Sequence, residues 1–517
     1  MLLPNSIVSD ANVVSASALL FVFVAVLVLR RRRSSLPLPP GPTGRFLVGN
    51  LWQLSEQLEQ DFITWGKQYD SDVIHIKVLG QHMIGLNSVE AATDLLDKRG
   101  SNYSDRPRFT LFEVMGWGLT LTFLRWGPRW KIHRRLFQTT LTQSAIKTFR
   151  PMQTQEAHKA VRSLLAAPQD WRDTTLLLTT SIIFRIAYGQ EVKSSTSPYT
   201  AMAEAANKAT TNGGIAGSTI VDIFPLARYV LPSCLSPALR HARQSRVAIR
   251  TIHDIPWGNS LRDIEAGTAA PSFMKKHYET WTANAKTGTP QETTLDDLKG
   301  ATAAVFIAGG NSTWGTILTL MLFLTKHRGV QQRVRDELDA VVGLSRLPTF
   351  DDRPVLTYFD AFMQECMRVL PLNPLVIPHC TLQDDVYKGV FIPAGSMVFA
   401  NTKAMSSDPA TYRDPEVFDP DRFLERGEPF PTGNFGFGRR KCPGNHLALA
   451  SVYIFIATLI SVFELDKVVD CEGKVLEPEA ALTVGLGGHP TDYECQLKLR
   501  SPERAKILQD LQAEKQP

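Results

Sequence analysis

The segment from Leu295 to His327 most constrains the fold of this chain. It reads LDDLKGATAAVFIAGGNSTWGTILTLMLFLTKH, contains no proline and is apolar on nearly every side. We expect such a helix inside a protein core, because a surface helix keeps one polar face. It is also far longer than an average helix of about 11–12 residues. A second membrane span is the alternative, but the GGNST sequence in its middle argues against it.

The remaining pattern predicts a mainly α fold with a small β portion. Residues 72–88 alternate apolar and polar side chains around a glycine, as paired strands do. Helical patterns follow in the segments 129–141, 329–343, 358–370 and 445–464. A length of 517 residues would allow about three domains, but no long linker and no internal repeat divides the chain. One large domain behind an N-terminal appendage is the simpler interpretation.

The N-terminal appendage has the pattern of a membrane anchor. The segment from Val13 to Leu29 is uncharged and almost wholly apolar. As a helix it would reach roughly 26 Å, against about 30 Å for a bilayer core. Four arginines follow at once, at 30–33, and no lysine or arginine precedes the run. A cleavable signal peptide, the alternative, would carry its positive charge first. The positive-inside rule therefore predicts a lumenal N-terminus and a cytosolic remainder.

These features divide the chain into three parts. Residues 1–33 are the predicted anchor with its basic stop, a single transmembrane helix. Residues 34–44, which contain LPLPPGP, are a predicted stiff hinge, because proline fixes φ and removes backbone donors. Residues 45–517 are the predicted single catalytic domain.

Charge and cysteine content exclude two classes of protein. The net charge of +5, from 56 basic and 51 acidic residues, is too small to indicate a nucleic-acid-binding protein. Six cysteines are scattered without a C-x-x-C pair, so we predict neither a disulfide scaffold nor a zinc site. We interpret five of them as core thiols in a reducing compartment. The sixth, Cys442, is different.

Cys442 lies in FGFGRRKCPG, residues 435–444, which combines three glycines with three consecutive basic residues. Neighbouring cations and a helix N-terminus both favour the thiolate form of a cysteine. The basic residues of the loop would be the cations, and the helix predicted after the loop would provide the N-terminus. The glycines let the backbone approach a flat partner closely. A stabilised thiolate beside a large planar group suggests heme iron, and a surface loop with a chance cysteine is the alternative.

This loop resembles the heme-binding loop of the cytochrome P450 family, F-x-x-G-x-R-x-C-x-G. All five fixed positions match, at Phe435, Gly438, Arg440, Cys442 and Gly444. Three further segments resemble family motifs in the same order: WKIHR resembles W-x-x-x-R, ECMR resembles E-x-x-R, and PEVFDPDRF resembles the aromatic–arginine segment. The resemblance is to fungal microsomal members and extends from the anchor to about residue 490. It implies the cytochrome P450 fold.

The resemblance also implies a heme b cofactor and the side chains that hold it. Cys442 would be the axial thiolate and the metal ligand. Arg134 and Arg440 would neutralise the heme propionates, because guanidinium groups bind carboxylates well. Trp130 would add its indole N–H. The cofactor-binding residues predicted on this basis are Trp130, Arg134, His379, Phe435, Arg440 and Cys442.

A second set of matched residues would have a structural role. Glu365 and Arg368, of the E-x-x-R match, lie one helical turn apart and can pair with each other. Arg422, of the aromatic–arginine segment, would complete a buried cluster with them. By the resemblance, this cluster would fix the loop that carries Cys442.

The long helix departs from the family pattern A/G-G-x-D/E-T. The matching residues are 308–312, where Asn311 replaces the acid and Ser312 replaces the threonine. Ser312 keeps a hydroxyl that can organise protons for O–O bond cleavage, whereas Asn311 can orient water but cannot relay a proton as a carboxylate would. We predict both as catalytic residues. Thr313 would be a spare hydroxyl bonded to its own helix.

The favoured function is a heme-thiolate monooxygenase. It would use O2 and reductase-supplied electrons to hydroxylate a lipophilic secondary metabolite, such as a terpenoid, polyketide or indolic compound. Two alternatives stay open: a peroxide-driven or rearranging heme-thiolate enzyme without reductase, and a non-catalytic heme- or lipophile-binding membrane protein. By analogy with the family, Phe306 and Gly310 would lie beside a pocket with apolar walls. Those walls would include Phe109, Leu111, Phe112, Met115, Trp117, Leu375, Val376 and Leu486.

Electrons would come from another protein, because the chain has no flavin or nucleotide fingerprint. NADPH-cytochrome P450 reductase on the same membrane is the expected partner, and no nucleic acid is expected. We expect a single-pass protein of the endoplasmic reticulum membrane with a cytosolic catalytic domain. The residues predicted to form a basic docking face near the thiolate side are Arg125, Arg129, Lys131, Arg135, Arg439 and Lys441.

Overall fold

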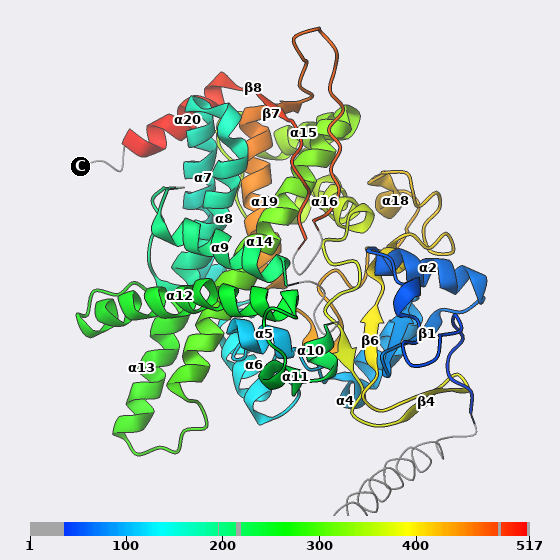
Figure 1. Cartoon of the computed structure of the whole chain (residues 1–517). Helices are drawn as coiled ribbons and strands as arrows, with labels where there is room; N and C mark the ends of the chain where they lie inside the picture. The colour runs from blue at the N-terminus through cyan, green and yellow to red at the C-terminus, as the bar shows by residue number, and fades with distance from the viewer. Residues whose placement is uncertain (1–35, 195, 214–218, 484–487, 514–517) are drawn as a thin grey trace, which may run out of the picture.

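The computed structural model of the chain describes residues 36–194, 196–213, 219–483 and 488–513. The predicted anchor and Leu486 lie outside these ranges. Within them the chain is mainly helical, and its strands form three small sheets (Figure 1). The predicted fold class is therefore confirmed for the described residues.

The elements are named as in Figure 1. The helices of eleven residues or more are α2 (Leu58–Gln68), α6 (Pro128–Thr140), α7 (Arg150–Ala166), α8 (Trp171–Tyr188), α9 (Pro198–Thr211), α12 (Pro237–Glu265), α13 (Phe273–Lys286), α14 (Leu295–Lys326), α15 (Arg328–Val342), α16 (Thr357–Val369), α19 (Asn445–Val462) and α20 (Pro502–Ala513). The short α-helices are α3 (Val89–Ala92), α4 (Gly100–Tyr103), α5 (Thr110–Met115), α10 (Ile220–Ile223), α11 (Ala227–Val230), α17 (Thr402–Ser406) and α18 (Asp421–Leu424). The strands are β1 (Val73–Val78), β2 (Gln81–Leu86), β3 (His379–Cys380), β4 (Asp385–Tyr387), β5 (Val390–Ile392), β6 (Met397–Ala400), β7 (Phe463–Asp466) and β8 (Gln496–Leu499).

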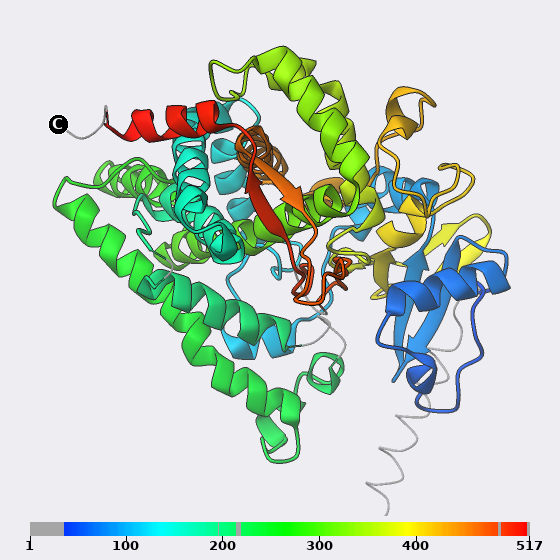
Figure 2. The same ribbon diagram turned by 90° about the horizontal axis from the view of Figure 1, so that it is seen from above.

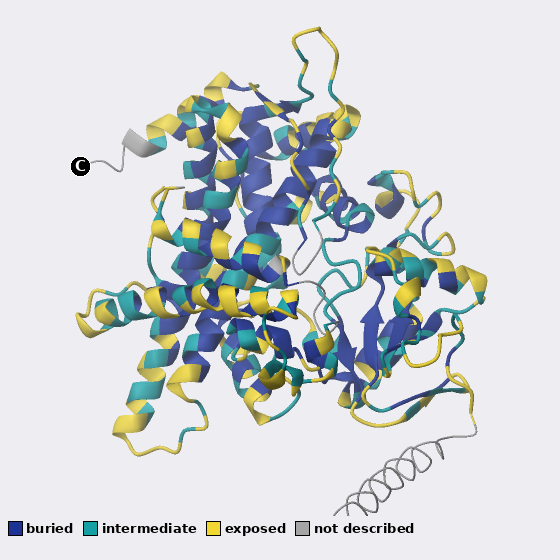
Figure 3. Ribbon diagram, viewed as in Figure 1, coloured by how far each residue is buried: buried dark blue, intermediate teal, exposed yellow. Residues whose placement is uncertain are grey.

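Helix α14 is the predicted central helix, and its bounds agree with the predicted segment to within one residue. A capping box closes its first turn. The Thr294 hydroxyl accepts the Asp297 N–H at 3.1 Å, and the Asp297 carboxylate accepts the Thr294 N–H at 3.0 Å. These bonds satisfy backbone donors that have no partner within the helix. The dark blue shading in Figure 3 marks α14 and α19 as the interior of the molecule.

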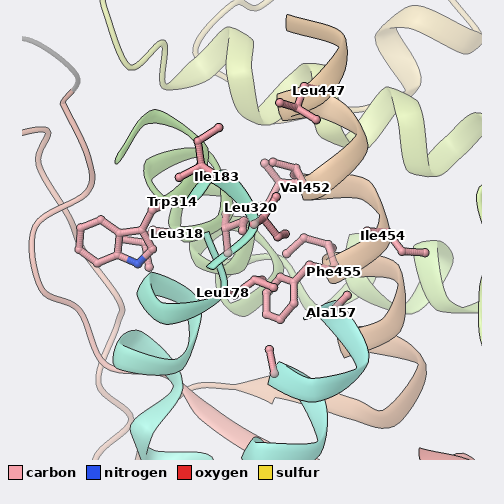
Figure 4. Close-up of a cluster of buried hydrophobic side chains, with 14 of the residues drawn as sticks. Ala157, Leu178, Ile183, Trp314, Leu318, Leu320, Leu447, Val452, Ile454 and Phe455 are labelled. Carbon is pink, nitrogen blue, oxygen red and sulfur yellow. The ribbon is translucent and has the colours of Figure 1, made fainter. Parts of the chain in front are cut away.

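The core is a bundle in which α14 packs against α8 and α19, and α7 packs against both of these. Figure 4 shows side chains from all four helices meeting in one cluster. The side chains labelled there are Ala157, Leu178, Ile183, Trp314, Leu318, Leu320, Leu447, Val452, Ile454 and Phe455. Helices α14 and α19 are also long and apolar enough to cross a membrane, but most of each is buried inside the fold. Their apolar character is therefore explained by the core.

The largest sheet has the strand order β1-β2-β6-β3. Strands β1 and β2 pair antiparallel, which confirms the strand pair predicted for residues 72–88. The proline-rich segment lies along this sheet, because the Pro40 carbonyl accepts the His75 N–H at 2.9 Å. At Gly41 an added Cβ would lie 2.0 Å from the His75 carbonyl oxygen, so only glycine allows this approach. The described part of the predicted hinge is thus bound to the body of the protein.

The other predicted helices are present. The segments predicted at 129–141, 329–343, 358–370 and 445–464 correspond to α6, α15, α16 and α19. The helix predicted at 445–464 is too long at its C-terminal end. The chain becomes extended at Phe463 and pairs as β7 with β8. In Figure 2, α12 runs along the outside of the molecule, and α9 lies between it and the central bundle.

The interpretation of five cysteines as core thiols is wrong for two of them. Cys366, Cys380 and Cys495 are buried, but Cys234 and Cys471 are exposed. Cys234 lies in the turn that precedes α12, and Cys471 lies in the loop between β7 and β8, so neither has a core beneath it.

Candidate functional site

A cavity of about 360 Å³ lies between α14 and the loop that carries Cys442. Cys442 and Ser312 both line it. Its wall is made by α14, by the loop and the start of α19, by α8 and α9, by α6 and the chain before it, and by the end of α16 and the chain after it. The sequence-predicted residues on this wall are Trp130, Arg134, Asn311, Ser312, Phe435, Arg440 and Cys442.

The loop is folded back on itself by its glycines. The Cys442 N–H donates to the Phe435 carbonyl at 2.8 Å, which closes the turn. Gly436 and Gly438 have φ of +75° and +53°, which side chains other than glycine rarely allow. At Gly438 an added Cβ would also lie 2.1 Å from the Leu96 carbonyl oxygen. Glycine at this position is therefore required by conformation and by space.

The Cys442 sulfur faces the cavity at the start of α19. Burial raises the pKa of its thiol, while the Gly444 N–H, the Arg134 guanidinium and the Asn445 N–H each lower it. The helix N-terminus thus acts as expected. The sequence predicted that the basic residues of the loop would supply the positive charge. The cation that lowers the pKa of the thiol is instead Arg134 of α6. A metal cation at this sulfur would deprotonate it fully.

Three arginines, Arg106, Arg134 and Arg440, meet at the cavity and are called here the arginine cradle. The Arg440 Nε donates to the Ser104 carbonyl at 2.8 Å, and its guanidinium lies 4.6 Å from the centre of the Trp130 ring. Its Nη1 and Nη2 are buried and have no hydrogen-bond partner in the described chain. Burial and the nearby Arg106 lower the pKa of Arg440. A group of three cations, two of which have buried nitrogens that lack partners in the described chain, fits a bound anion.

Arg106 is the cradle residue that the sequence prediction missed. It is buried, donates through Nη1 to the carbonyls of Ile377 and Pro378, and leaves its Nε without a partner among the described residues. Burial lowers the pKa of Arg106. A sequence signal existed, because Arg106 comes shortly before Phe109, the first of the residues predicted for the pocket wall. A buried arginine there needs an anion.

Arg134 is the third residue of the arginine cradle, and His379 lies beside the cradle. The Arg134 Nη1 donates to the Lys441 carbonyl at 2.7 Å, so it ties α6 to the cysteine loop. His379 is buried in β3 and is not part of the cavity wall. Its Nδ1 lies 2.7 Å from the Tyr103 carbonyl oxygen, and its Nε2 has no partner in the described ranges. Burial and then Arg106 hold the pKa of His379 well below its ordinary value.

The predicted Glu365–Arg368–Arg422 cluster is confirmed. Arg368 donates to both oxygens of Glu365 at 2.7 and 2.8 Å, and Arg422 donates to the same carboxylate at 3.0 Å. All three side chains are buried. The Arg422 Nη1 also donates to the Glu428 carboxylate at 2.8 Å, and other N–H groups bind carbonyls of the chain before the cysteine loop, including those of Ser406 and Val417. The cluster therefore holds the segment that leads into the loop.

The α14 side of the cavity carries small and hydroxyl-bearing residues. Ala308 is exposed to the cavity, and the Ser312 hydroxyl donates to the Ala308 carbonyl at 2.7 Å. The expectation that Thr313 would be bonded to its own helix is wrong, because no partner of its hydroxyl is present among the described residues. Thr313 also lines the cavity. On α14 the wall thus presents the hydroxyls of Ser312, Thr313, Thr316 and Thr319, and those of Ser312, Thr316 and Thr319 are bonded to the helix backbone.

Most of the predicted apolar wall lies elsewhere. Of the named residues that the structure describes, Trp117 and Val376 line the cavity, and neither Phe306 nor Gly310 does. The α5 side chain of Phe112 lies behind the wall, because it contacts the wall residue Phe123 with ring centres 4.8 Å apart. The apolar side chains found on the wall include Leu121, Phe123, Phe137, Leu141, Ile182, Ile183, Val305, Leu370 and Leu372.

The six residues of the predicted basic face are all exposed. Three of them are paired with acids, because Arg125 binds Asp105, Arg129 binds Asp297, and Arg135 lies 3.8 Å from Glu292. The other three have no ion pair with a described residue. Lys131 and Arg439 lie 5.5 and 5.2 Å from the centre of the Trp126 ring. The unpaired part of the face is therefore Lys131, Arg439 and Lys441.

Comparison with known proteins agrees with this geometry. The model of the cytochrome P450 family matches residues 39–489. A cytochrome P450 monooxygenase of Armillaria gallica is 35% identical over 483 residues, which cover 92% of this chain and 94% of the relative. Tryptamine 4-monooxygenase of Psilocybe cyanescens is 34% identical over 485 residues, which cover 91% of this chain and 94% of the relative. The family binds heme iron through a cysteine thiolate and takes electrons from a redox partner. The chain therefore belongs to the cytochrome P450 family and is a monooxygenase of the fungal type.

Proposed function

We propose that this monooxygenase hydroxylates a lipophilic secondary metabolite with O2 and with electrons from NADPH-cytochrome P450 reductase. The observation that carries the proposal is a largely apolar cavity with the Cys442 sulfur and the Ser312 hydroxyl on its wall. A thiolate ligand and a hydroxyl group are what oxygen activation requires of the protein. Terpenoids, polyketides and indolic compounds are the substrate classes to test, and the name of one relative gives tryptamine as the substrate of that relative.

The cofactor in this proposal is heme b. It supplies the iron at which oxygen is bound and reduced. Cys442 holds the iron, and Phe435 and Trp130 flank the cofactor. The fit is supported by the arginine cradle. Nη1 and Nη2 of Arg440 and Nε of Arg106 are buried, lack partners in the described chain and match the two carboxylates of a heme. His379 joins them through Nε2 if it takes a second proton.

Ser312 and Asn311 position the protons and water in this proposal. The Ser312 hydroxyl donates to its own helix, so it has lone pairs left to accept a hydrogen bond from water. A rotation about χ1 frees its proton for donation into the cavity. Asn311 keeps the position of the family's acid without a charge, so it can orient a water molecule and cannot act as a base.

The redox partner docks, in this proposal, on the face formed by Lys131, Arg439 and Lys441. These cations have no ion pair with described residues, and they lie on the side of the molecule that carries the cysteine loop. A partner with an acidic surface would be attracted and oriented by them. Residues 1–33 would anchor the chain in the endoplasmic reticulum membrane and residues 34–44 would connect the anchor to the cytosolic domain, residues 45–517.

A peroxide-driven or rearranging reaction is the second candidate. It is favoured by the amide at Asn311, because such a reaction needs fewer delivered protons. The assignment to a monooxygenase family favours catalysis over non-catalytic heme or lipophile binding.

The test is turnover of the full-length chain in membranes with reductase and NADPH. Candidate metabolites are supplied under 18O2, and products are identified by mass spectrometry. We expect one labelled oxygen atom per product, and no product without reductase or without NADPH. Product formation from peroxide alone would instead support the second candidate. The Cys442→Ala variant should lose the thiolate-type carbon monoxide difference spectrum, and Ser312→Ala should keep it while losing product per NADPH consumed.

A further inference from the structure

The cavity wall carries no acidic side chain among the described residues. Its charged members are the three arginines of the cradle, and the polar remainder consists of amides and hydroxyls. Position 311, where the family pattern has an acid, holds an amide in this chain. A cationic ligand would therefore find no acidic side chain in the described wall, and the carboxylates of the proposed cofactor would already be paired with the arginine cradle.

The hydroxyl groups on the wall cannot replace that counter-ion. The Thr210 hydroxyl donates to the Ala206 carbonyl at 2.7 Å, and the Thr316 hydroxyl donates to the Ser312 carbonyl at 2.9 Å. Each keeps lone pairs that can accept one more hydrogen bond. A neutral acceptor does not compensate a full charge that has lost its hydration, so a buried ammonium would stay unfavourable.

Asn207 is the wall residue best placed to recognise a neutral polar group. It lies on α9, which packs against α12 and α14, so its position is fixed by two neighbouring helices. It is half-buried, lines the cavity and makes no hydrogen bond to a described residue. A side-chain amide both donates and accepts, so it can bind a hydroxyl or a carbonyl of a ligand.

We infer that this cavity selects an uncharged lipophilic substrate over a cation of the same shape, and that Asn207 contacts the polar group of that substrate. The inference rests on the proposed function and narrows its substrate class to neutral molecules with a hydroxyl or carbonyl group. Asn207 is a specificity-determining residue in this account.

Matched ligands that differ by one charge test the inference. Indole and decalin are each given a two-carbon chain that ends in trimethylammonium or in uncharged tert-butyl. A quaternary nitrogen has no lone pair, so it cannot ligate iron and bind for that reason. Dissociation constants are measured by equilibrium dialysis with the full-length, heme-loaded chain. We expect the uncharged member to bind at least about tenfold more tightly. Equal or tighter binding of the cation, or binding of neither member, would overturn the inference.

Two variants at position 207 separate the effect of a charge on ligand binding from the effect of a neutral polar group. Asn207→Asp places a carboxylate on the wall and should strengthen binding of the trimethylammonium ligands by about tenfold. Asn207→Leu should leave them unchanged and should weaken binding of the corresponding alcohols several-fold. Unaltered ligand preference in both variants contradicts the role of Asn207. A chain without the thiolate-type spectrum contradicts the proposed function, whereas a chain with that spectrum and a preference for cations contradicts only this inference.

Discussion

The two buried arginine clusters of this protein differ in whether the chain itself supplies their anion. In the first, Arg368 and Arg422 share the Glu365 carboxylate, Arg422 also binds the Glu428 carboxylate, and the other N–H groups donate to backbone carbonyls. In the second, Arg440 keeps two nitrogens and Arg106 keeps one without a partner in the described ranges. A buried charge without a partner is strongly unfavourable. The first cluster, called here the closed cluster, is therefore complete in the folded chain. The second, the arginine cradle, is complete only with an added anion and is called here the open cluster.

The difference follows from where the residues lie in the sequence. Glu365 and Arg368 are one turn apart on α16, so the pair forms locally as soon as the helix forms. The cradle arginines come from three distant segments. Burial lowers the pKa of Arg106 and of Arg440, and the neighbouring acid Asp105 acts to raise both. The Asp105 carboxylate, however, is paired with Arg125. A cluster closed within the chain stabilises the fold, whereas a cluster left open marks a place where the fold binds something.

Removing the acid of the closed cluster should give the largest effect. Glu365→Gln leaves the buried Arg368 without a counter-charge and leaves Arg422 with Glu428 alone, which should lower the free energy of unfolding by about 3–5 kcal/mol. The measurement is the thermal midpoint of the loaded protein, with the yield of folded chain as a second readout. The matched control is Glu90→Gln, since Glu90 pairs with Lys388 at 3.1 Å on the surface. That change should have an effect below about 1 kcal/mol. Equal effects of the two changes would remove the distinction between the clusters.

Removing a cation from the open cluster should stabilise the cofactor-free protein and should weaken the binding of heme in the loaded protein. Without cofactor, Arg440→Met removes an uncompensated buried charge and should raise the free energy of unfolding by about 1–2 kcal/mol. With cofactor, the same change removes charge-assisted hydrogen bonds and should speed heme loss about tenfold. Thermal unfolding of the heme-depleted chain and transfer of heme to an acceptor protein measure the two effects.

Arg439→Met is the matched control for that experiment, because Arg439 is the neighbouring residue and its side chain is exposed over Trp126. It should change neither stability nor heme loss. A change of the same sign in both forms of Arg440→Met would show that the cradle does not hold an anion.

The parts of the molecule that sequence predicted well are those fixed by neighbours along the chain. The cysteine loop was predicted because its glycines, its cysteine and the following helix occur together within residues 435–462. The Glu365–Arg368 pair was predicted from its local spacing, and the distant partner Arg422 was predicted from the family resemblance. The central helix was predicted because a long apolar segment without proline has few alternatives.

The parts that sequence predicted poorly depend on contacts between distant segments. The cation that acts on Cys442 is Arg134, more than 300 positions away, and not the adjacent basic residues. The α5 side chains were expected on the cavity wall but pack against other aromatic residues instead, as Phe112 does with Phe123. An apolar residue satisfies a core and a pocket equally well, so its sequence does not distinguish the two.

The smallest expected effect concerns His379, which lies beside the open cluster. Its Nδ1 faces the Tyr103 carbonyl at 2.7 Å and must carry the hydrogen, so Nε2 is a lone pair in the neutral ring. Burial and then Arg106 hold the pKa of His379 well below 6.5 in the cofactor-free fold. The unfolded chain therefore binds a proton below about pH 6.5 that the folded chain does not bind. Stability is present above this pH and is lost as the pH falls, by at most about 1.4 kcal/mol per pH unit.

His379→Gln should remove this part of the acid sensitivity. The thermal midpoint of the cofactor-free chain is measured from pH 7.5 to pH 5 for both proteins and compared as a difference, because other buried histidines such as His133 and His277 have pKa values lowered in the same direction. In the loaded protein the difference should shrink, since carboxylates beside Nε2 would raise the pKa of His379 and let the folded chain take up the same proton. If the difference is as large with cofactor as without it, His379 does not face an anion and the open cluster is limited to its arginines.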